Sequence, residues 1–237
     1  MASVEPGFLE GMAPRVLLAP AKLFIGMTLA LVGLLLMAWA VDLLCVVLLW
    51  PYRVGGLRSM LAEELAAGTA IVVRQGGESS TLRGAANGIF GLLFEDTGIL
   101  EMGYRFADPQ SLSIPNTVVR GAWVAHHEKL ETIMLGTQLV GLRVSILARF
   151  IPLIALLQMV GVLEGLSRRA ARRATADRES AYLYHRAKYG QLVALMLGSA
   201  VLIWWPSPLA WVPCGAGLAT LASLLAAARW AFYKKAI

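Results

Sequence analysis

Long runs of apolar residues, separated by polar segments of very different length, dominate the hydropathy pattern of the chain. The longest run covers residues 23–50 and contains a single ionisable side chain, Asp42. Further runs cover residues 143–166, 190–205 and 209–228. Because about 20 apolar residues suffice for a helix to cross a bilayer, the pattern predicts four transmembrane helices at these positions. The predicted fold class is therefore an all-α membrane protein.

Polar segments separate the predicted spans and differ in character. Residues 1–22 contain three prolines and two acids, which is not the composition of a secretory signal peptide, so we expect an uncleaved first helix. Residues 51–142 mix scattered charges with many glycines. Within them, residues 56–68 predict a short amphipathic helix, and residues 116–150 predict a longer one running into the second span. We therefore expect a partly helical loop or small domain between the first and second spans.

The distribution of charge predicts the orientation. Residues 51–142 carry seven basic and nine acidic side chains, whereas residues 167–189 carry seven basic side chains against only Asp177 and Glu179. Short cytoplasmic loops are enriched in Lys and Arg, so we place residues 167–189 and the tail, residues 229–237, in the cytoplasm. Four spans then put both termini in the cytoplasm of a bacterial inner-membrane protein and export residues 51–142 to the periplasm.

Asp42 is the most informative residue of the first span. An ionisable side chain inside a membrane is costly and commonly functional. Two interpretations stay open: Asp42 pairs with Arg143 or Arg149 of a neighbouring helix, or it couples the movement of a proton or an ion.

Residue types that bind metals or cofactors do not form a recognisable site. His126 and His127 precede Glu128, but adjacent side chains on a helix point about 100° apart, and His185 lies across the membrane in the predicted topology. Cys45 and Cys214 sit singly in apolar runs, far from the spacing of a zinc or disulfide pair. We therefore expect no metal and no cofactor.

Catalytic patterns are equally weak. The glycine pairs Gly55–Gly56 and Gly76–Gly77 match neither a Walker A loop nor a dinucleotide fingerprint, and we interpret them as turns. An enzyme acting on lipid or peptidoglycan would need an acid and a base in the exported segment, where Glu95, Asp96 and Glu101 form the only acidic cluster. Because charged loops are usually just solvated, we expect the protein not to be an enzyme.

The basic segment contains a distinctive motif, RESAYLYHRAKY, at residues 178–189. Such a segment can be a topology determinant that attracts anionic lipid headgroups, or a docking surface for an acidic partner or DNA. The motif interleaves tyrosines with charges, and on a helix Tyr182 and Arg186 share one face. That pattern favours a specific contact over a generic anchor, although we do not expect direct binding of DNA.

The motif, the arginine pairs before it and the hairpin GQLVALMLGSAVLIWWPSPLAW after it resemble the integrating conjugative element membrane proteins. This family has no known biochemical function and is encoded in conjugative transfer regions, typically beside a TraD-like coupling ATPase. The resemblance implies an inner-membrane component of a type IV secretion or conjugation apparatus without catalytic residues. The candidates it supplies for a partner contact are Arg178, Glu179, Tyr182, Tyr184, His185, Arg186 and Lys188.

The sequence thus predicts an accessory membrane subunit of a conjugative DNA transfer system that acts by protein–protein assembly. Its expected partners are membrane lipids and other subunits of the apparatus, such as a TraD-like coupling protein, and homo-oligomerisation stays open. The alternative hypothesis is a small ion-coupled transporter or channel that uses Asp42.

Overall fold

A computed structural model describes residues 32–45, 54–107, 117–175 and 181–233, together with residues 26, 29, 47 and 48. The chain divides into two compact units, Met1–Met37 and Ala38–Ile237. An apolar helix, Val32–Cys45, crosses the boundary between the units. The predicted N-terminal segment 1–22 and the motif positions Arg178 and Glu179 lie outside the described residues.

The larger unit is helical, with no strand among its described residues. Its first part contains α2 (Val54–Arg74), α3 (Ser80–Phe90), a short π-helix (Gly91–Glu95), α4 (Ile99–Ala107) and α5 (Thr117–Ala148). Both helices predicted in the segment 51–142 are present, as α2 and α5, and α2 is longer than predicted. The prediction that this segment is partly helical is therefore confirmed.

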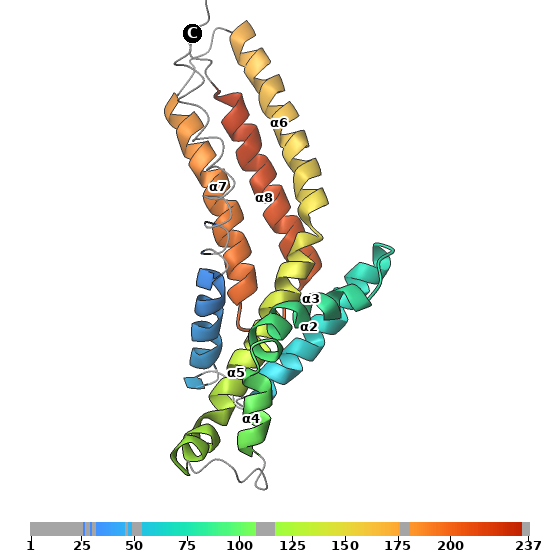
Figure 1. Ribbon diagram of the computed structural model, residues 1–237. Helices are drawn as coiled ribbons and strands as arrows, with labels where there is room; N and C mark the ends of the chain where they lie inside the picture. The colour runs from blue at the N-terminus through green and yellow to red at the C-terminus, as the bar shows by residue number, and fades with distance from the viewer. Residues whose placement is uncertain are drawn as a thin grey trace, which may run out of the picture. The chain divides into compact units, whose positions relative to one another are not determined.

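Three long helices follow: α6 (Ile151–Ala174), α7 (Ala181–Trp204) and α8 (Trp211–Ala231). They form a three-helix bundle in which α8 lies between α6 and α7 (Figure 1). α6 and α8 run in the same direction and α7 runs in the opposite one. One end of the bundle therefore holds the end of α6, the start of α7 and the end of α8, and the other holds the α7–α8 turn.

Four helices of the described residues are long and apolar enough to span a membrane: Ala125–Ala148, Ile151–Ala174, Tyr182–Trp204 and Trp211–Ala231. The last three overlap the predicted second, third and fourth spans, and Val32–Cys45 lies inside the predicted first one. α6 and α7 expose large apolar side chains along their length, as helices facing lipid do. These side chains are Leu156, Met159, Val160, Leu163, Leu192, Val193, Met196 and Leu197. The chain is a multi-pass all-α membrane protein.

The helix boundaries differ from the predicted spans in two places. The chain breaks its helix between Ala148 and Ile151, inside the predicted span 143–166, where Pro152 occupies the first turn of α6. The predicted basic loop, 167–189, is largely helical because α6 continues to Ala174 and α7 begins at Ala181. Arginine, lysine and alanine favour helices, so the polar ends of the spans continue as helices past the apolar runs.

The apolar stretch of α5 is covered by protein. Half of the most apolar stretch of α5 is buried inside the molecule, whereas the corresponding buried share is 11% for α6 and 6% for α7. Gly141 brings the backbones of α3 and α5 close together, since a Cβ there would lie 2.7 Å from the Ala85 carbonyl oxygen, and Gly68 of α2 leaves room for the Ile146 side chain. The apolar core of this region includes Val72, Leu82, Ala86, Leu142 and Ile146. Protein packing thus accounts for much of the hydrophobicity of α5.

The two glycine pairs behave differently. Gly76 has a φ of +74°, and the Gly77 N–H donates to the Val72 carbonyl at 2.9 Å, so this pair ends α2 in the turn that was predicted. The interpretation of Gly55–Gly56 as a turn was wrong, because both residues lie in the first turn of α2.

Small residues allow α6 and α8 to pack closely. Gly161 and Gly165 lie one turn apart on α6, and a Cβ at Gly165 would lie only 2.5 Å from the Ala227 carbonyl oxygen. On α8 the facing residues also repeat every four positions, as Gly215, Ala219, Ser223 and Ala227. The Ser223 hydroxyl donates to the Leu157 carbonyl of α6 at 2.6 Å. Small residues spaced by four are a general device for close helix contacts in membranes.

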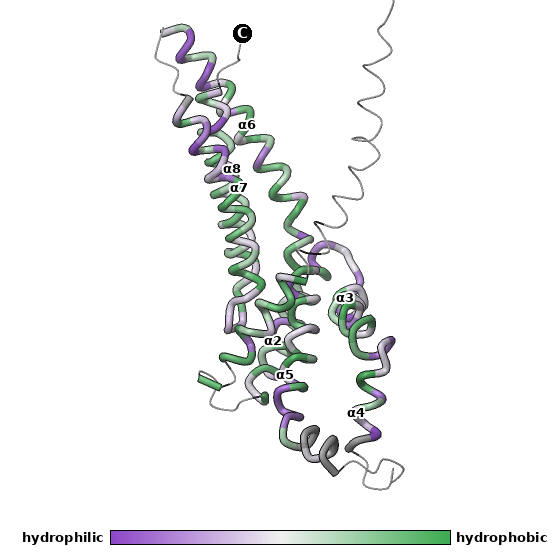
Figure 2. The backbone as a smooth tube through the Cα atoms, turned by 60° about the vertical axis from the view of Figure 1, so that its left-hand side comes forward, coloured by the Kyte–Doolittle hydropathy of each residue, from purple (hydrophilic) through white to green (hydrophobic). Residues whose placement is uncertain are grey.

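Hydropathy along the backbone follows this architecture. Figure 2 shows an apolar middle in α6, α7 and α8 and a hydrophilic end where α6 ends and α7 begins. The bundle therefore has a charged end beyond its apolar length.

Candidate functional site

The hydrophilic end of the bundle contains most of the motif residues. We call it the basic aromatic end and define it by residues 168–174, 181–189 and 229–233. Arg172 and Arg173 occupy the last turn of α6, where a positive side chain interacts favourably with the partial negative charge of a helix C-terminus. The local sequence therefore places cations where α6 ends.

Two arginines of α6 pack on the aromatic residues that follow α8. The Arg172 guanidinium lies 3.9 Å from the centre of the Phe232 ring, and that of Arg169 lies 5.1 Å from the centre of the Tyr233 ring. Such cation–π contacts are worth about 0.5–1 kcal/mol each at exposed positions. They tie the end of α6 to the end of α8.

Tyr184 ties α7 into the same cluster. Its ring meets Tyr233 edge to face at 5.6 Å between centroids, and the Arg229 guanidinium lies 5.9 Å from the ring centre. The side chain is half-buried. Tyr184, a predicted contact residue for a partner, thus makes its contacts within the molecule.

Four other residues of α7 form a continuous exposed face, which we call the exposed stripe: Tyr182, His185, Arg186 and Tyr189. Their spacing of three, four and seven residues places them on one side of a helix. Tyr182 and Tyr189 are 63% and 61% exposed, and His185 and Arg186 are also exposed. The Arg186 guanidinium lies 4.8 Å from the Tyr182 ring centre, so these two side chains share a face, as their spacing predicts.

The exposed stripe presents aromatic rings and hydrogen-bond donors to solvent, whereas the Tyr184 ring packs on Tyr233 within the molecule. Tyrosine and arginine are enriched where proteins contact one another, because they combine apolar area with hydrogen-bond donors. Lys188 is exposed as well but lies on the neighbouring face of α7. The stripe therefore has the composition of a surface that contacts another protein.

At the opposite end of the bundle, the α7–α8 turn is held by a fully buried ion pair. The Arg143 guanidinium of α5 lies 2.8 Å from a carboxylate oxygen of Glu64 in α2, and neither side chain is more than 1% exposed. Arg143 also donates hydrogen bonds to the backbone carbonyls of Ile203, Trp205 and Ser207 at 2.6–3.0 Å. It thereby satisfies carbonyls in the last turn of α7 and in the turn that follows it.

Glu64 completes this arrangement from the other side. Its carboxylate accepts hydrogen bonds from the Leu209 backbone N–H at 3.1 Å and from the Trp211 indole N–H. Arg143 and Glu64 together connect α2 and α5 to the turn between α7 and α8. Sequence reasoning missed this pair, since the two residues lie 79 positions apart; an arginine inside an apolar run was the only available signal.

Asp42 is buried, at 6% exposure, and packs against Gly136 of α5, where any Cβ would collide with its carboxylate. One turn earlier, the Trp39 indole N–H donates to the Thr137 hydroxyl at 3.0 Å. Of the two arginines proposed as its partners, Arg143 forms its ion pair with Glu64 and Arg149 donates to the Thr81 hydroxyl at 2.7 Å. Asp42 therefore sits against α5 without either expected salt bridge, although Arg143 remains within its electrostatic range.

The residues considered for metal binding or catalysis are spread over exposed surfaces. His126, His127 and Glu128 lie on an exposed part of α5, and Glu95 and Asp96 are exposed near the π-helix. Glu101 forms an ion pair with Arg105 at 2.6 Å. Within the described parts of the chain, no three His, Cys, Asp or Glu side chains gather as they would around a metal ion.

Comparison with known proteins concerns the region from α2 through α8. The family model described as "IncC plasmid conjugative DNA transfer protein DtrJ-like" matches residues 53–233. The chain belongs to this DtrJ-like family. The match includes the buried ion pair, the three-helix bundle and the basic aromatic end, and it confirms that the chain is a conjugative DNA transfer protein, as the resemblance implied. No curated protein and no solved structure matches the chain.

Proposed function

We propose that this DtrJ-like protein is an accessory inner-membrane subunit of a conjugative type IV secretion apparatus, possessing no enzymatic activity and acting by protein–protein assembly. The observation that supports it most directly is the exposed stripe of Tyr182, His185, Arg186 and Tyr189, an aromatic and cationic face on a protein of a conjugative transfer family. The proposed partner is a TraD-like coupling ATPase, and the proposed genetic context includes integrating conjugative elements.

The proposed topology places both termini and the basic aromatic end in the cytoplasm and residues 51–142, which include α2–α4 and most of α5, in the periplasm. The positive-inside tendency supports it, because the arginines of α6 gather at one end of the bundle. Cysteines introduced at Ser79 and Thr175, both exposed, test it in a variant with Cys45 and Cys214 replaced by alanine. In intact cells a membrane-impermeant maleimide should label position 79 and spare position 175. Labelling of position 175 in intact cells would overturn the topology.

The exposed stripe is tested by replacing Tyr182, His185 and Arg186 with alanine while Tyr184 is kept. Because these side chains are exposed, the variant should keep its level and membrane insertion but transfer DNA at least about tenfold less often, as expected when an interface anchor is lost. A matched control replaces Tyr104 and Arg105 of α4 with alanine, since both are about 70% exposed. Normal transfer by the stripe variant would exclude the stripe as a functional contact.

The identity of the partner requires a separate experiment. A photo-reactive amino acid at Tyr189, which is 61% exposed, should form an adduct with the coupling ATPase during mating, whereas the same amino acid at Tyr104 should not. An adduct with another subunit would retain the assembly role and exclude the coupling ATPase.

A second candidate function rests on Asp42, whose carboxylate is buried against α5. Buried carboxylates in membrane helices often serve ion pathways, so we propose a small ion-coupled transporter or channel as the alternative. Asp42→Asn should then abolish activity while Asp42→Glu preserves part of it. If DNA transfer is normal in both variants, Asp42 has a structural role only.

A further inference from the structure

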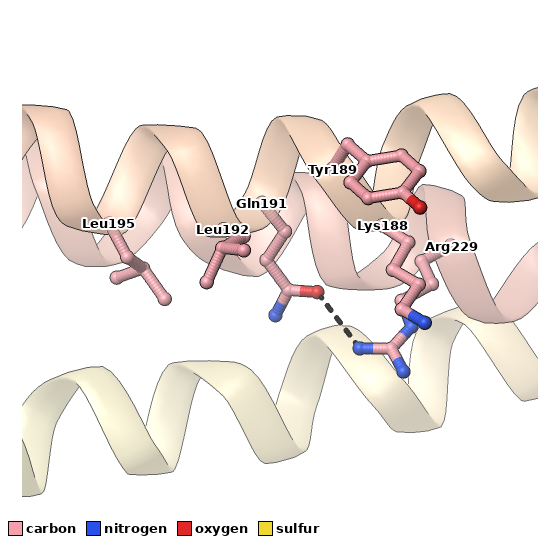
Figure 3. A pocket seen from close by; sticks show the side chains of 6 residues that line it. All are labelled: Lys188, Tyr189, Gln191, Leu192, Leu195 and Arg229. Carbon is pink, nitrogen blue, oxygen red and sulfur yellow. Dashed lines mark hydrogen bonds between the residues drawn. The ribbon is translucent and has the colours of Figure 1, made fainter. Parts of the chain in front are cut away.

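A pocket of about 270 Å³ opens on the bundle beside the basic aromatic end. Its lining comes from α7 and the end of α8: Lys188, Tyr189, Gln191, Leu192, Leu195 and Arg229. Figure 3 shows Lys188 and Arg229 pointing to one end of the pocket and Leu192 and Leu195 lying toward the other. The pocket is thus cationic at one end and apolar at the other.

The register of α7 produces this division. Lys188, Leu192 and Leu195 follow one another at spacings of four and three residues, so they lie on one face. This face is adjacent to the exposed stripe and shares none of its four residues. At 1.5 Å per residue, Leu195 lies roughly 10 Å along the helix from Lys188, toward the apolar middle of the bundle.

Arg229 is held in place by a chain of hydrogen bonds. Its Nη1 donates to the Gln191 amide oxygen at 3.4 Å, and the Gln191 amide nitrogen donates to Gln158 of α6 at 2.6 Å. A guanidinium fixed in this way is suited to phosphate oxygens, which it binds with several N–H groups at once.

The position of the two cations along the spans identifies the ligand class. Lys188 precedes the apolar run 190–205 and Arg229 follows the run 209–228, so both lie where a predicted span meets the headgroup layer. Leu192 and Leu195 lie inside the apolar run 190–205, where a spanning helix meets acyl chains. Basic pockets between membrane helices bind anionic lipid headgroups, and a cavity of about 270 Å³ is too small for a folded protein surface.

We propose that this pocket is a specific site for one anionic phospholipid, with the phosphate on Lys188 and Arg229 and an acyl chain along Leu192 and Leu195. The inference does not depend on the proposed partner, because the four residues proposed to bind the lipid are not stripe residues, although Tyr189 of the stripe also lines the pocket. It depends only on the bundle spanning a membrane.

The experiment measures phospholipid retained by the full-length protein purified in mild detergent, using native mass spectrometry after addition of phosphatidylglycerol or phosphatidylcholine. The wild type should keep one phosphatidylglycerol molecule and no phosphatidylcholine. Lys188→Gln and Arg229→Gln should each lower retention about tenfold, the usual effect of losing one charge-assisted contact. Arg186→Gln removes an exposed cation one half-turn away on α7 and should leave retention unchanged.

Two further arms separate a lipid from a free anion. Leu195→Trp fills the apolar end and should lower retention of phosphatidylglycerol, with helical content by circular dichroism as the check on folding. Inorganic phosphate at millimolar concentration should fail to displace the lipid, because it lacks the acyl chain. Displacement by phosphate, equal retention of both lipids, or an equal loss in Arg186→Gln would each overturn the site.

Discussion

The two ends of the α6–α8 bundle use arginine in opposite ways. At the turn between α7 and α8, Arg143 is fully buried and donates hydrogen bonds to Glu64 and to three backbone carbonyls. At the basic aromatic end, Arg169, Arg172 and Arg186 stack on aromatic rings. The first arrangement holds the guanidinium in one position, because a buried charge must be paired and hydrogen-bonded. In the second, Arg186 is exposed to solvent together with the tyrosine ring on which it stacks.

This difference separates an end held by a buried ion pair from an end at which cations stack on aromatic rings. A buried ion pair cannot contact a partner. Removing one of its side chains leaves the other charge buried and unpaired, which destabilises the fold. Replacing an exposed cation that stacks on a tyrosine should change the stability of the protein little. It should weaken the binding of any partner that contacts this cation. Substitutions at the two ends should therefore affect different measurements.

The largest expected effect comes from breaking the buried pair. Arg143→Ala or Glu64→Ala leaves one buried charge uncompensated, which typically costs about 3–5 kcal/mol of folding free energy. The measurement is unfolding in mixed micelles followed by circular dichroism. The double variant Arg143→Met with Glu64→Leu should recover part of the loss, because it removes both charges.

If the single variants unfold like the wild type, the turn is held by its apolar contacts alone and the comparison of the two ends fails. The exposed pair of Arg58 and Glu131 offers the matched control, with an expected loss of about 0–1 kcal/mol for Arg58→Ala.

A smaller loss is expected at the α6–α8 contact that joins the two ends. Gly161→Ala places a methyl group against the Ser223 carbonyl, and overpacking of this kind typically costs about 1–3 kcal/mol. Gly217→Ala on α8 is the control, because nothing lies within 4 Å of its new Cβ. The same unfolding measurement applies, and equal stabilities of the two variants would mean that α6 can move away from α8 without cost.

The next effect distinguishes two of the three tyrosines of the motif, Tyr182 and Tyr184. Tyr184→Ala removes the edge-to-face contact with Tyr233 and should cost about 1 kcal/mol of stability. Tyr182→Ala should leave stability within about 0.5 kcal/mol of the wild type, as exposed substitutions usually do, and lower transfer frequency in a mating assay. A stability loss in Tyr182→Ala as large as in Tyr184→Ala would remove the distinction between the cluster and the exposed stripe.

The smallest effect is expected for the ion pair between Arg168 and Glu164 on α6. Both side chains are at least half exposed and lie one turn apart, so Arg168→Gln should change stability by only about 0.3–0.5 kcal/mol. A loss of several kcal/mol would show that the basic aromatic end is as tightly coupled to folding as the buried end.

Much of the fold was predictable because it depends on local patterns. The apolar runs at 190–205 and 209–228 predicted α7 and α8, and the amphipathic pattern after Gly56 predicted α2. Gly55 and Gly56 were misassigned as a turn, since local composition cannot show that a helix already begins at Val54. The basic segment was expected to be a loop, whereas its arginines and alanines continue α6 and begin α7.

The candidate site was predictable only in part. The motif directed attention to Tyr182, His185, Arg186 and Lys188, but not to the difference between Tyr184, which packs on Tyr233, and Tyr182, which is exposed. Assigning Lys188 to the pocket and not to the exposed stripe also required the positions of Gln191 and Arg229 in the structure. Helical spacing alone cannot say which face of α7 another helix covers.

By itself the sequence determined that the chain is an all-α membrane protein with its positive charge gathered at one place, because hydrophobicity and charge along a chain decide which segments enter a bilayer. Tertiary structure alone decided the pairing of Glu64 with Arg143, the close approach of Asp42 to Gly136 and the pocket between Lys188 and Arg229. Each of these joins residues from different helices. Their proximity results from packing, and no pattern within a single helix contains it.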